Sequence, residues 1–200
     1  MKQSVLIVLA AMIPSLALSQ STFQFINRHL PSGIDAPVFD AFGNRLSGTN
    51  YVAILYGGPT VDWLTVAWED VPHQPMPPVP FTFMPGGQSG YFNYDGFQSD
   101  FVEIRTVSCG GIAWLQVRAW DVRLGATYEE VVNLGLGGYG ESNLFQKQGG
   151  MNCGPFVSSP SPLIGLESFA LREVIPEPSA TLLLLLSLPA LLFLRRRRSP

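Results

Sequence analysis

The stretch Ile112–Asp121, IAWLQVRAWD, is the clearest strand pattern in the chain and decides its fold class. Its side chains alternate strictly, as they do along a half-buried strand with a period of two. One face carries only small and aliphatic side chains that suit a core: Ala113, Leu115, Val117 and Ala119. The opposite face carries two large rings and two hydrogen-bonding groups: Trp114, Gln116, Arg118 and Trp120. The chain is therefore predicted to contain a β-sheet that buries one face in a hydrophobic core.

Short runs rich in aromatic and β-branched residues surround this strand, and glycine and proline separate them. We expect further strands at 22–27, 51–56, 63–68, 79–84, 101–107 and 168–172. Long helical patterns are missing between these runs, which disfavours βαβ units. The pattern predicts a mainly β single domain over residues 20–173, an antiparallel β-sandwich or a jelly-roll-like fold.

One short helix is expected within this β domain. Thr127 and Glu130 have the spacing of a capping box, Tyr128–Leu134 follows, and Gly135 stands at the position just past a helix end. The sequence therefore predicts a helix over Tyr128–Leu134.

The polar face of the central strand supports two interpretations. Trp114 and Trp120 could stack on a sugar ring while Gln116 and Arg118 hydrogen-bond its hydroxyls. Alternatively, both indoles lie under a loop or under the proline-rich segment 72–85, and Arg118 pairs with an acid such as Glu103. The first interpretation makes these four residues a candidate glycan contact.

The two cysteines, Cys109 and Cys153, either form a disulfide or remain free buried thiols. We expect the disulfide, which would close a loop of about 45 residues and contribute on the order of 4 kcal/mol in the chain-entropy model. A metal site is not expected, because His29 and His73 lie far apart and other ligands are few. No cofactor is predicted.

The charge of the central region is strongly acidic. Residues 20–178 carry seven basic and fifteen acidic side chains, a net charge of −8, whereas the other five basic residues lie at the two chain ends. An acidic body argues against nucleic acid as a partner.

The C-terminal residues 174–198 combine three elements in order. Pro176, Glu177 and Pro178 form a stiff, extended triplet that suits recognition by a protease. Residues 180–194 follow, with nine leucines, and would span about 22 Å as a helix against roughly 30 Å of hydrocarbon. A basic cluster, which predicts a cytoplasmic C-terminus by the positive-inside rule, ends the segment: Arg195, Arg196, Arg197 and Arg198.

This tail resembles the PEP-CTERM sorting signal of exported bacterial proteins. The resemblance implies recognition and cleavage by an exosortase-type membrane protease, in a producer with two membranes that secretes exopolysaccharide. An ordinary single-span anchor is the alternative. Three segments of the body are similar to those of uncharacterised exported proteins with such tails, which carry no assigned activity: YVAILYGGP, AWLQVRAWD, and GATYEEVVNLG with the following GYGESNLF.

The N-terminal residues 1–19 have a basic start at Lys2, an apolar run and small residues at Ala17 and Ser19. They predict a secretory signal peptide, handled by the export translocon and removed by signal peptidase between Ser19 and Gln20. Cleavage after Ala17 and an uncleaved N-terminal anchor are the alternatives.

No catalytic constellation emerges from the sequence. The acids at Glu129 and Glu130 are neighbours, and Glu130 is assigned to the helix cap, so Glu129 is expected to be a solvated helix residue. We therefore expect a non-enzymatic structural or adhesive protein at the cell surface or in the extracellular matrix, held transiently in the inner membrane. A carbohydrate-binding module acting on exopolysaccharide is the alternative, and an extracellular hydrolase is a third.

Overall fold

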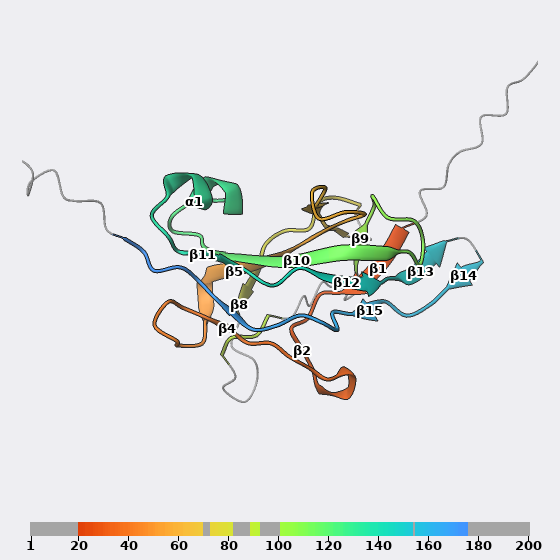
Figure 1. Cartoon of the computed structure of the whole chain (residues 1–200), viewed down its shortest axis with the longest axis horizontal. Helices are drawn as coiled ribbons and strands as arrows, with labels where there is room; N and C mark the ends of the chain where they lie inside the picture. Colours follow the sequence, from red (N-terminus) through yellow and green to blue (C-terminus); the bar gives the residue numbers. More distant parts are fainter. Residues whose placement is uncertain (1–19, 70–72, 82–88, 93–100, 154, 176–200) are drawn as a thin grey trace, which may run out of the picture.

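The computed structural model describes residues 20–69, 73–81, 89–92, 101–153 and 155–175, which form a single, mainly β domain. Figure 1 shows an elongated body in which the long strand β10 (Ile112–Asp121) runs along the middle. Two six-stranded sheets make up most of the domain. The predicted β class and single-domain organisation are confirmed.

The sheet around β10 is antiparallel throughout. Its order is β11 (Tyr139–Glu141), β10, β5 (Gly48–Gly58) and β6 (Thr65–Val66), with β12 (Phe145–Gln148) also on β10 and β8 (Val79–Phe81) also on β5. The longest pairing joins β10 to β5, from Trp114 opposite Gly58 to Asp121 opposite Tyr51. The inward face of β10 is fully buried as predicted, because all four of its small and aliphatic residues are 0% exposed.

The second sheet has the N-terminal strand at its centre. Its order is β14 (Phe156–Val157), β13 (Gly150–Cys153), β1 (Gln20–Gln24), β9 (Phe101–Ile104) and β7 (Trp68–Glu69), and β15 (Ser161–Pro162) pairs in parallel with β1. Two small pairs complete the strands, β2 (Arg28–His29) with β3 (Ile34–Asp35), and β16 (Phe169–Ala170) with β4 (Val38–Phe39). A 3₁₀ turn, η1, spans Leu30–Ser32 between β2 and β3.

One core joins the two sheets. Its buried residues include Phe23 and Val102 from the sheet that contains β1, and Leu55 from the sheet that contains β10. Gly57 of β5 marks a close approach, since a Cβ there would lie 2.5 Å from Cδ1 of Ile104 on β9. Both sheets therefore share a single hydrophobic interior.

The predicted helix forms with the predicted boundaries as α1 (Tyr128–Leu134). The Thr127 hydroxyl accepts a bond from the Glu130 amide, and the Glu130 carboxylate accepts from the Thr127 amide. Gly135 adopts the left-handed conformation, φ 69°, that ends the helix. Local sequence signals were sufficient here because every capping contact lies within one turn.

One predicted strand needs correction, and one region with strands was not predicted. The expected strand 63–68 is divided, because β6 pairs with β5 in one sheet while β7 pairs with β9 in the other. The region 139–157 contains β11 to β14, which the sequence analysis did not predict. β11, β12 and β13 are rich in glycine and polar residues, and β14 has only two residues, so none of them shows the longer apolar alternation that marks the others.

The expected disulfide between Cys109 and Cys153 is present. It links β13 to the turn between β9 and β10, and this turn joins one sheet to the other. Gln20 and Ile175, the ends of the described chain, lie at opposite ends of the long axis (Figure 1). No helix within residues 20–175, where described, has both the length and the apolar character to cross a bilayer. The predicted signal peptide and the predicted tail from Pro176 onward lie outside the described residues.

Candidate functional site: the α1 cleft

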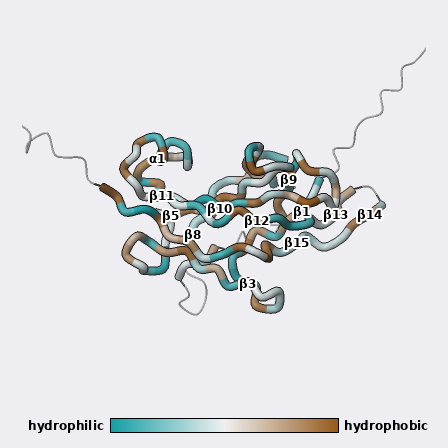
Figure 2. Tube along the Cα trace, viewed as in Figure 1, coloured by the Kyte–Doolittle hydropathy of each residue, from teal (hydrophilic) through white to brown (hydrophobic). Residues whose placement is uncertain are grey.

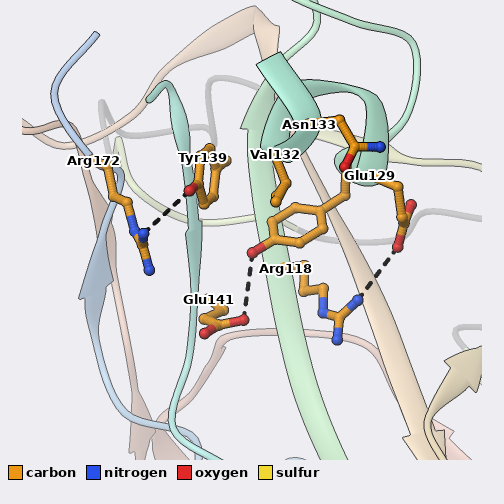
Figure 3. A pocket seen from close by; sticks show the side chains of 8 residues that line it. Arg118, Glu129, Val132, Asn133, Tyr139, Glu141 and Arg172 are labelled. Carbon is orange, nitrogen blue, oxygen red and sulfur yellow. Dashed lines mark hydrogen bonds and ion pairs between the residues drawn. The ribbon is translucent and has the colours of Figure 1, made fainter. Parts of the chain in front are cut away.

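A polar cleft opens between α1 and the outward face of the β10 sheet, and we call it the α1 cleft (Figure 3). Its volume is about 430 Å³. It is lined by Arg118, Tyr128, Glu129, Val132, Asn133, Tyr139, Glu141 and Arg172. These residues come from β10, α1, β11 and the segment after β16.

Strand register places the floor of the cleft. In the pairing of β10 with β11, Arg118 lies opposite Glu141 and Trp120 opposite Tyr139. Partners directly opposite in a ladder project from the same face. The cleft floor is therefore the outward face of β10, the face that the sequence marked by its mixture of rings and polar groups.

Three aromatic rings pack against one another at the cleft. Trp120 and Tyr128 meet edge to face with centroids 6.3 Å apart, and Tyr128 and Tyr139 do so at 5.7 Å. The Trp120 indole nitrogen donates a hydrogen bond to the Gly125 carbonyl in the turn before α1. Such edge-to-face contacts hold the rings in definite orientations. They attach the short helix to the sheet.

Arg118 is the central cation of the cleft. Its guanidinium lies over the Tyr56 ring at 4.0 Å and close to the Tyr128 ring at 5.0 Å. It pairs with Glu129 at 3.3 Å, and its Nε donates to the Gln116 side-chain oxygen at 3.0 Å. The Tyr56 hydroxyl donates to the same Glu129 carboxylate at 2.6 Å. These contacts hold the guanidinium in one place, which preorganises it as a donor.

A second set of polar groups, from Tyr139, Glu141 and Arg172, lies on the side of the cleft away from Glu129 (Figure 3). The Tyr128 hydroxyl donates to Glu141 at 3.4 Å. Arg172 donates to the Tyr139 hydroxyl at 3.1 Å, and its guanidinium stands 4.9 Å from the centre of that ring. The cleft thus has one arginine and one glutamate on each side of a central tyrosine.

Two phenols of this network are held in their neutral form. Burial, followed by the hydrogen bond to Glu129 and the charge of that carboxylate, raises the pKa of Tyr56 well above its usual range. Burial and the negative charge of Glu141 likewise raise the pKa of Tyr128. Both hydroxyls therefore remain proton donors at any physiological pH.

The chemistry of the cleft is that of a neutral, densely hydrogen-bonding surface. Two guanidinium groups are balanced by two carboxylates, and Asn133 adds an amide that both donates and accepts. This alternation suits a ligand that itself has many donors and acceptors and no net charge. Among the described residues, no group of histidine, cysteine and acidic side chains has the arrangement to hold a metal ion.

The predicted glycan face is only partly available. Arg118 lines the cleft, whereas Trp114 is half-buried and is not among the lining residues. Gln116 is buried and acts by orienting Arg118. The prediction that Trp120 stacks on a sugar ring was wrong, because this residue is only 1% exposed and lies beneath α1. The alternative interpretation holds in part: Trp120 is buried and Arg118 pairs with an acid, although that acid is Glu129, while Glu103 lies 3.6 Å from Arg105.

Several residues of the cleft were not identified from the sequence. Tyr139, Glu141 and Arg172 come from strands and segments whose pairing with β10 or α1 has no local sequence signal. Glu129 was expected to be merely solvated. Its side chain is 56% exposed, yet it joins Arg118 to Tyr56.

The remaining predicted sites lie at the chain ends. Gln20, the predicted first residue after signal cleavage, begins the central strand β1. Ser19 and the sorting residues lie outside the described chain: Pro176, Glu177, Pro178, Arg195, Arg196, Arg197 and Arg198.

No protein-family model matches the chain, and no curated protein or solved structure matches it either. The function is therefore inferred from the chemistry of the chain itself.

Proposed function

We propose that this protein is an exported, non-enzymatic component of the cell surface or extracellular matrix, folded as a β-sandwich. The observation that carries this proposal is the disulfide between Cys109 and Cys153. Disulfides persist in oxidising compartments and are rare in the cytosol. The sandwich itself is supported by the shared core and by the contact of Gly57 with Ile104 between the two sheets.

The route of export is proposed from the two chain ends. Residues 1–19 direct translocation and are removed, and the segment 180–194 then holds the protein in the inner membrane. An exosortase-type protease acts near Pro176-Glu177-Pro178 and releases the body toward the surface. The order of the three elements in the C-terminal segment, the Pro-Glu-Pro triplet, the apolar run and the arginine cluster, supports this route.

Intact-mass analysis of the exported protein tests this proposal. The expected chain begins at Gln20 and lacks residues 180–200, and its mass is 2 Da lower than that of the fully reduced chain, since a disulfide removes two hydrogens. Recovery of only full-length protein in the inner membrane, with Arg195–Arg198 attached, would contradict the proposed release.

A second candidate function, glycan binding, is favoured by the α1 cleft. Its arginine and glutamate pairs match the hydroxyls of a neutral polysaccharide, and the preformed bonds of Arg118 reduce the ordering cost of binding. We propose a neutral glycan of the surrounding exopolysaccharide as the ligand.

A glycan array probed with the purified protein tests this second function. Arg172→Ala removes one exposed donor of the cleft and should weaken binding about tenfold, the effect of roughly 1.4 kcal/mol. Arg45→Ala is the matched control, because Arg45 is also an exposed arginine beside a tyrosine ring, that of Tyr91, but lies outside the cleft. Absence of binding to any glycan would remove this function.

The same samples separate binding from hydrolysis. Glu129 and Glu141 both line the cleft, so a hydrolase would use this pair. We expect no release of reducing ends from any bound polysaccharide. Release that disappears in Glu141→Gln would overturn the non-enzymatic proposal.

A further inference from the structure

Exposed apolar side chains gather at the end of the body where the described chain terminates, and we call this end the C-terminal pole. Phe42 is 77% exposed, Val174 42% and Ile175 66%, and Leu134 at the end of α1 is 49% exposed. A shallow hollow of about 140 Å³ brings Phe42 and Val174 together. Figure 2 shows α1 and the end of the described chain at the same end of the molecule.

The backbone is attached to the body up to its last described residue. The Ile175 amide donates to the Leu136 carbonyl at 2.6 Å, and the Gly138 amide donates to the Arg172 carbonyl at 2.9 Å. Only residues 176–179 then separate Ile175 from the apolar segment that begins at Ala180. Even fully extended, this connection covers no more than about 18 Å.

We infer that the C-terminal pole is a lipid-facing surface on which the body rests while its tail is in the membrane. This inference depends on the proposed insertion of the segment 180–194. The short connection brings the pole close to the bilayer, and Phe42, Leu134, Val174 and Ile175 present the apolar surface that the interfacial region accepts. The occupant of this surface is the lipid interface itself.

The charges of the pole indicate how it binds. Its hollow is lined by two carboxylates and two guanidinium groups, from Asp40, Asp121, Arg123 and Arg172, so it has no excess positive charge. The body as a whole is acidic, and anionic headgroups therefore offer it no attraction. Docking is an apolar contact that requires no anionic lipid and does not weaken with salt.

The opposite end of the body provides a matched control. Phe156 of β14 is 67% exposed, nearly as much as Phe42, and its neighbour Val157 is 75% exposed. Both phenylalanines are exposed on short surface segments, but β14 lies at the far end of the long axis (Figure 1).

The experiment places the full chain in nanodiscs of neutral phosphatidylcholine. A photo-crosslinking phenylalanine analogue replaces Phe42 in one sample and Phe156 in another, and lipid adducts are counted by mass spectrometry after illumination. We expect at least tenfold more adducts at position 42 than at 156, unchanged in 0.5 M salt and unchanged when a third of the lipid is anionic. Substitution of Val174 by Ser should reduce the adducts at position 42.

The possible results are distinguishable. Equal adduct yields at both positions, in protein that co-elutes with the discs, would overturn the docking surface while leaving tail insertion intact. Adducts at position 42 that appear only with anionic lipid and vanish in salt would also overturn it, because the contact would then be electrostatic. Protein that does not co-elute with the discs would overturn tail insertion and the docking surface together.

Discussion

The phenol of Tyr56 shows how a single residue connects the core with the cleft. Its ring is buried beneath the Arg118 guanidinium, while its hydroxyl donates to Glu129 at the cleft edge. Deprotonation would place a negative charge beside a carboxylate in a poorly solvated position. Burial and the neighbouring carboxylate therefore raise the pKa of this phenol and favour its protonated form.

An alkaline titration of the tyrosines, followed by ultraviolet absorbance, should detect this constraint. Burial raises the pKa of Tyr56, Tyr91 and Tyr128, so these phenols should ionise later than free tyrosine, whose pKa is about 10. Tyr56→Phe should remove one late phenol from the titration. In denaturant all phenols should ionise together near pH 10, and late ionisation that persists in denaturant would contradict the assignment.

The sign of the effect on stability follows from the same shift. Because the folded pKa of Tyr56 is raised, its contribution to folding is complete below about pH 10 and is lost as the pH rises through the folded value. The free energy of unfolding should therefore decline above pH 10, and less steeply in Tyr56→Phe. Chemical denaturation at pH 8 and pH 11 measures the difference.

Asp121 and Arg123 determine a pH dependence at the acid end. Burial alone would raise the pKa of Asp121, but hydrogen bonds from the Arg123 side chain and backbone outweigh burial and lower it. A lowered folded pKa gives stability that is present above about pH 4 and is lost as the pH falls through the folded value.

Removal of this pairing should shift acid unfolding. In Arg123→Gln, burial should dominate, so the pKa of Asp121 rises and the midpoint of acid unfolding moves to higher pH. Circular dichroism against pH measures the midpoint. Arg45→Gln is the control, since that arginine faces the neutral ring of Tyr91 and should leave the midpoint unchanged.

At the scale of elements, β10 and α1 together define the site. β10 buries its small and aliphatic face in the core, and its other face forms the cleft floor. α1 has only seven residues, too few to be stable alone, so it depends on its caps and on the packing of Tyr128 against Trp120 and Tyr139. The helix then supplies the cleft wall through Glu129 and Asn133.

Loss of the helix cap should lower the free energy of unfolding. Thr127→Ala removes the acceptor for the Glu130 amide and should cost about 0.5–2 kcal/mol of unfolding free energy. Urea denaturation measures this cost. Ser47→Ala, at an exposed loop position, should change stability by less than about 0.5 kcal/mol. Equal effects of the two substitutions would contradict the role of the cap.

At the scale of the whole molecule, the disulfide attaches β13 to the turn through which the chain passes from one sheet to the other. Cys153 lies in β13 beside the N-terminal strand, and Cys109 lies in the turn that leads into β10. The bond closes a loop with a sequence separation of 44 residues. It therefore lowers the conformational entropy of the unfolded chain across this loop.

Loss of this bond should destabilise the domain substantially. Cys109→Ser with Cys153→Ser should lower the free energy of unfolding by about 4 kcal/mol, the value for a loop of this length. Denaturation of the variant, compared with the oxidised and the reduced native protein, measures the loss. An unchanged midpoint in the variant would show that the bond is dispensable.

The sequence by itself determined the local features of this protein. Strict alternation predicted β10 and its buried face, the capping residues predicted α1 to the residue, and two cysteines in a chain with predicted export signals indicated the disulfide. The predictions of β10 and α1 depend on patterns within one element, and the disulfide prediction depends on a choice between only two cysteines. The apolar periodicity of the β10 face is sufficient because the period of a strand is independent of its neighbours.

Only the tertiary structure decided which side chains of the outer face remain accessible. Trp120 and Arg118 share one face of β10, yet α1 covers the indole and leaves the guanidinium at the cleft. The partners Glu141 and Arg172 reach the same cleft through the placement of β11 and of the segment after β16. Alternation specifies on which face a side chain lies, but the burial of that face depends on which distant element packs over it.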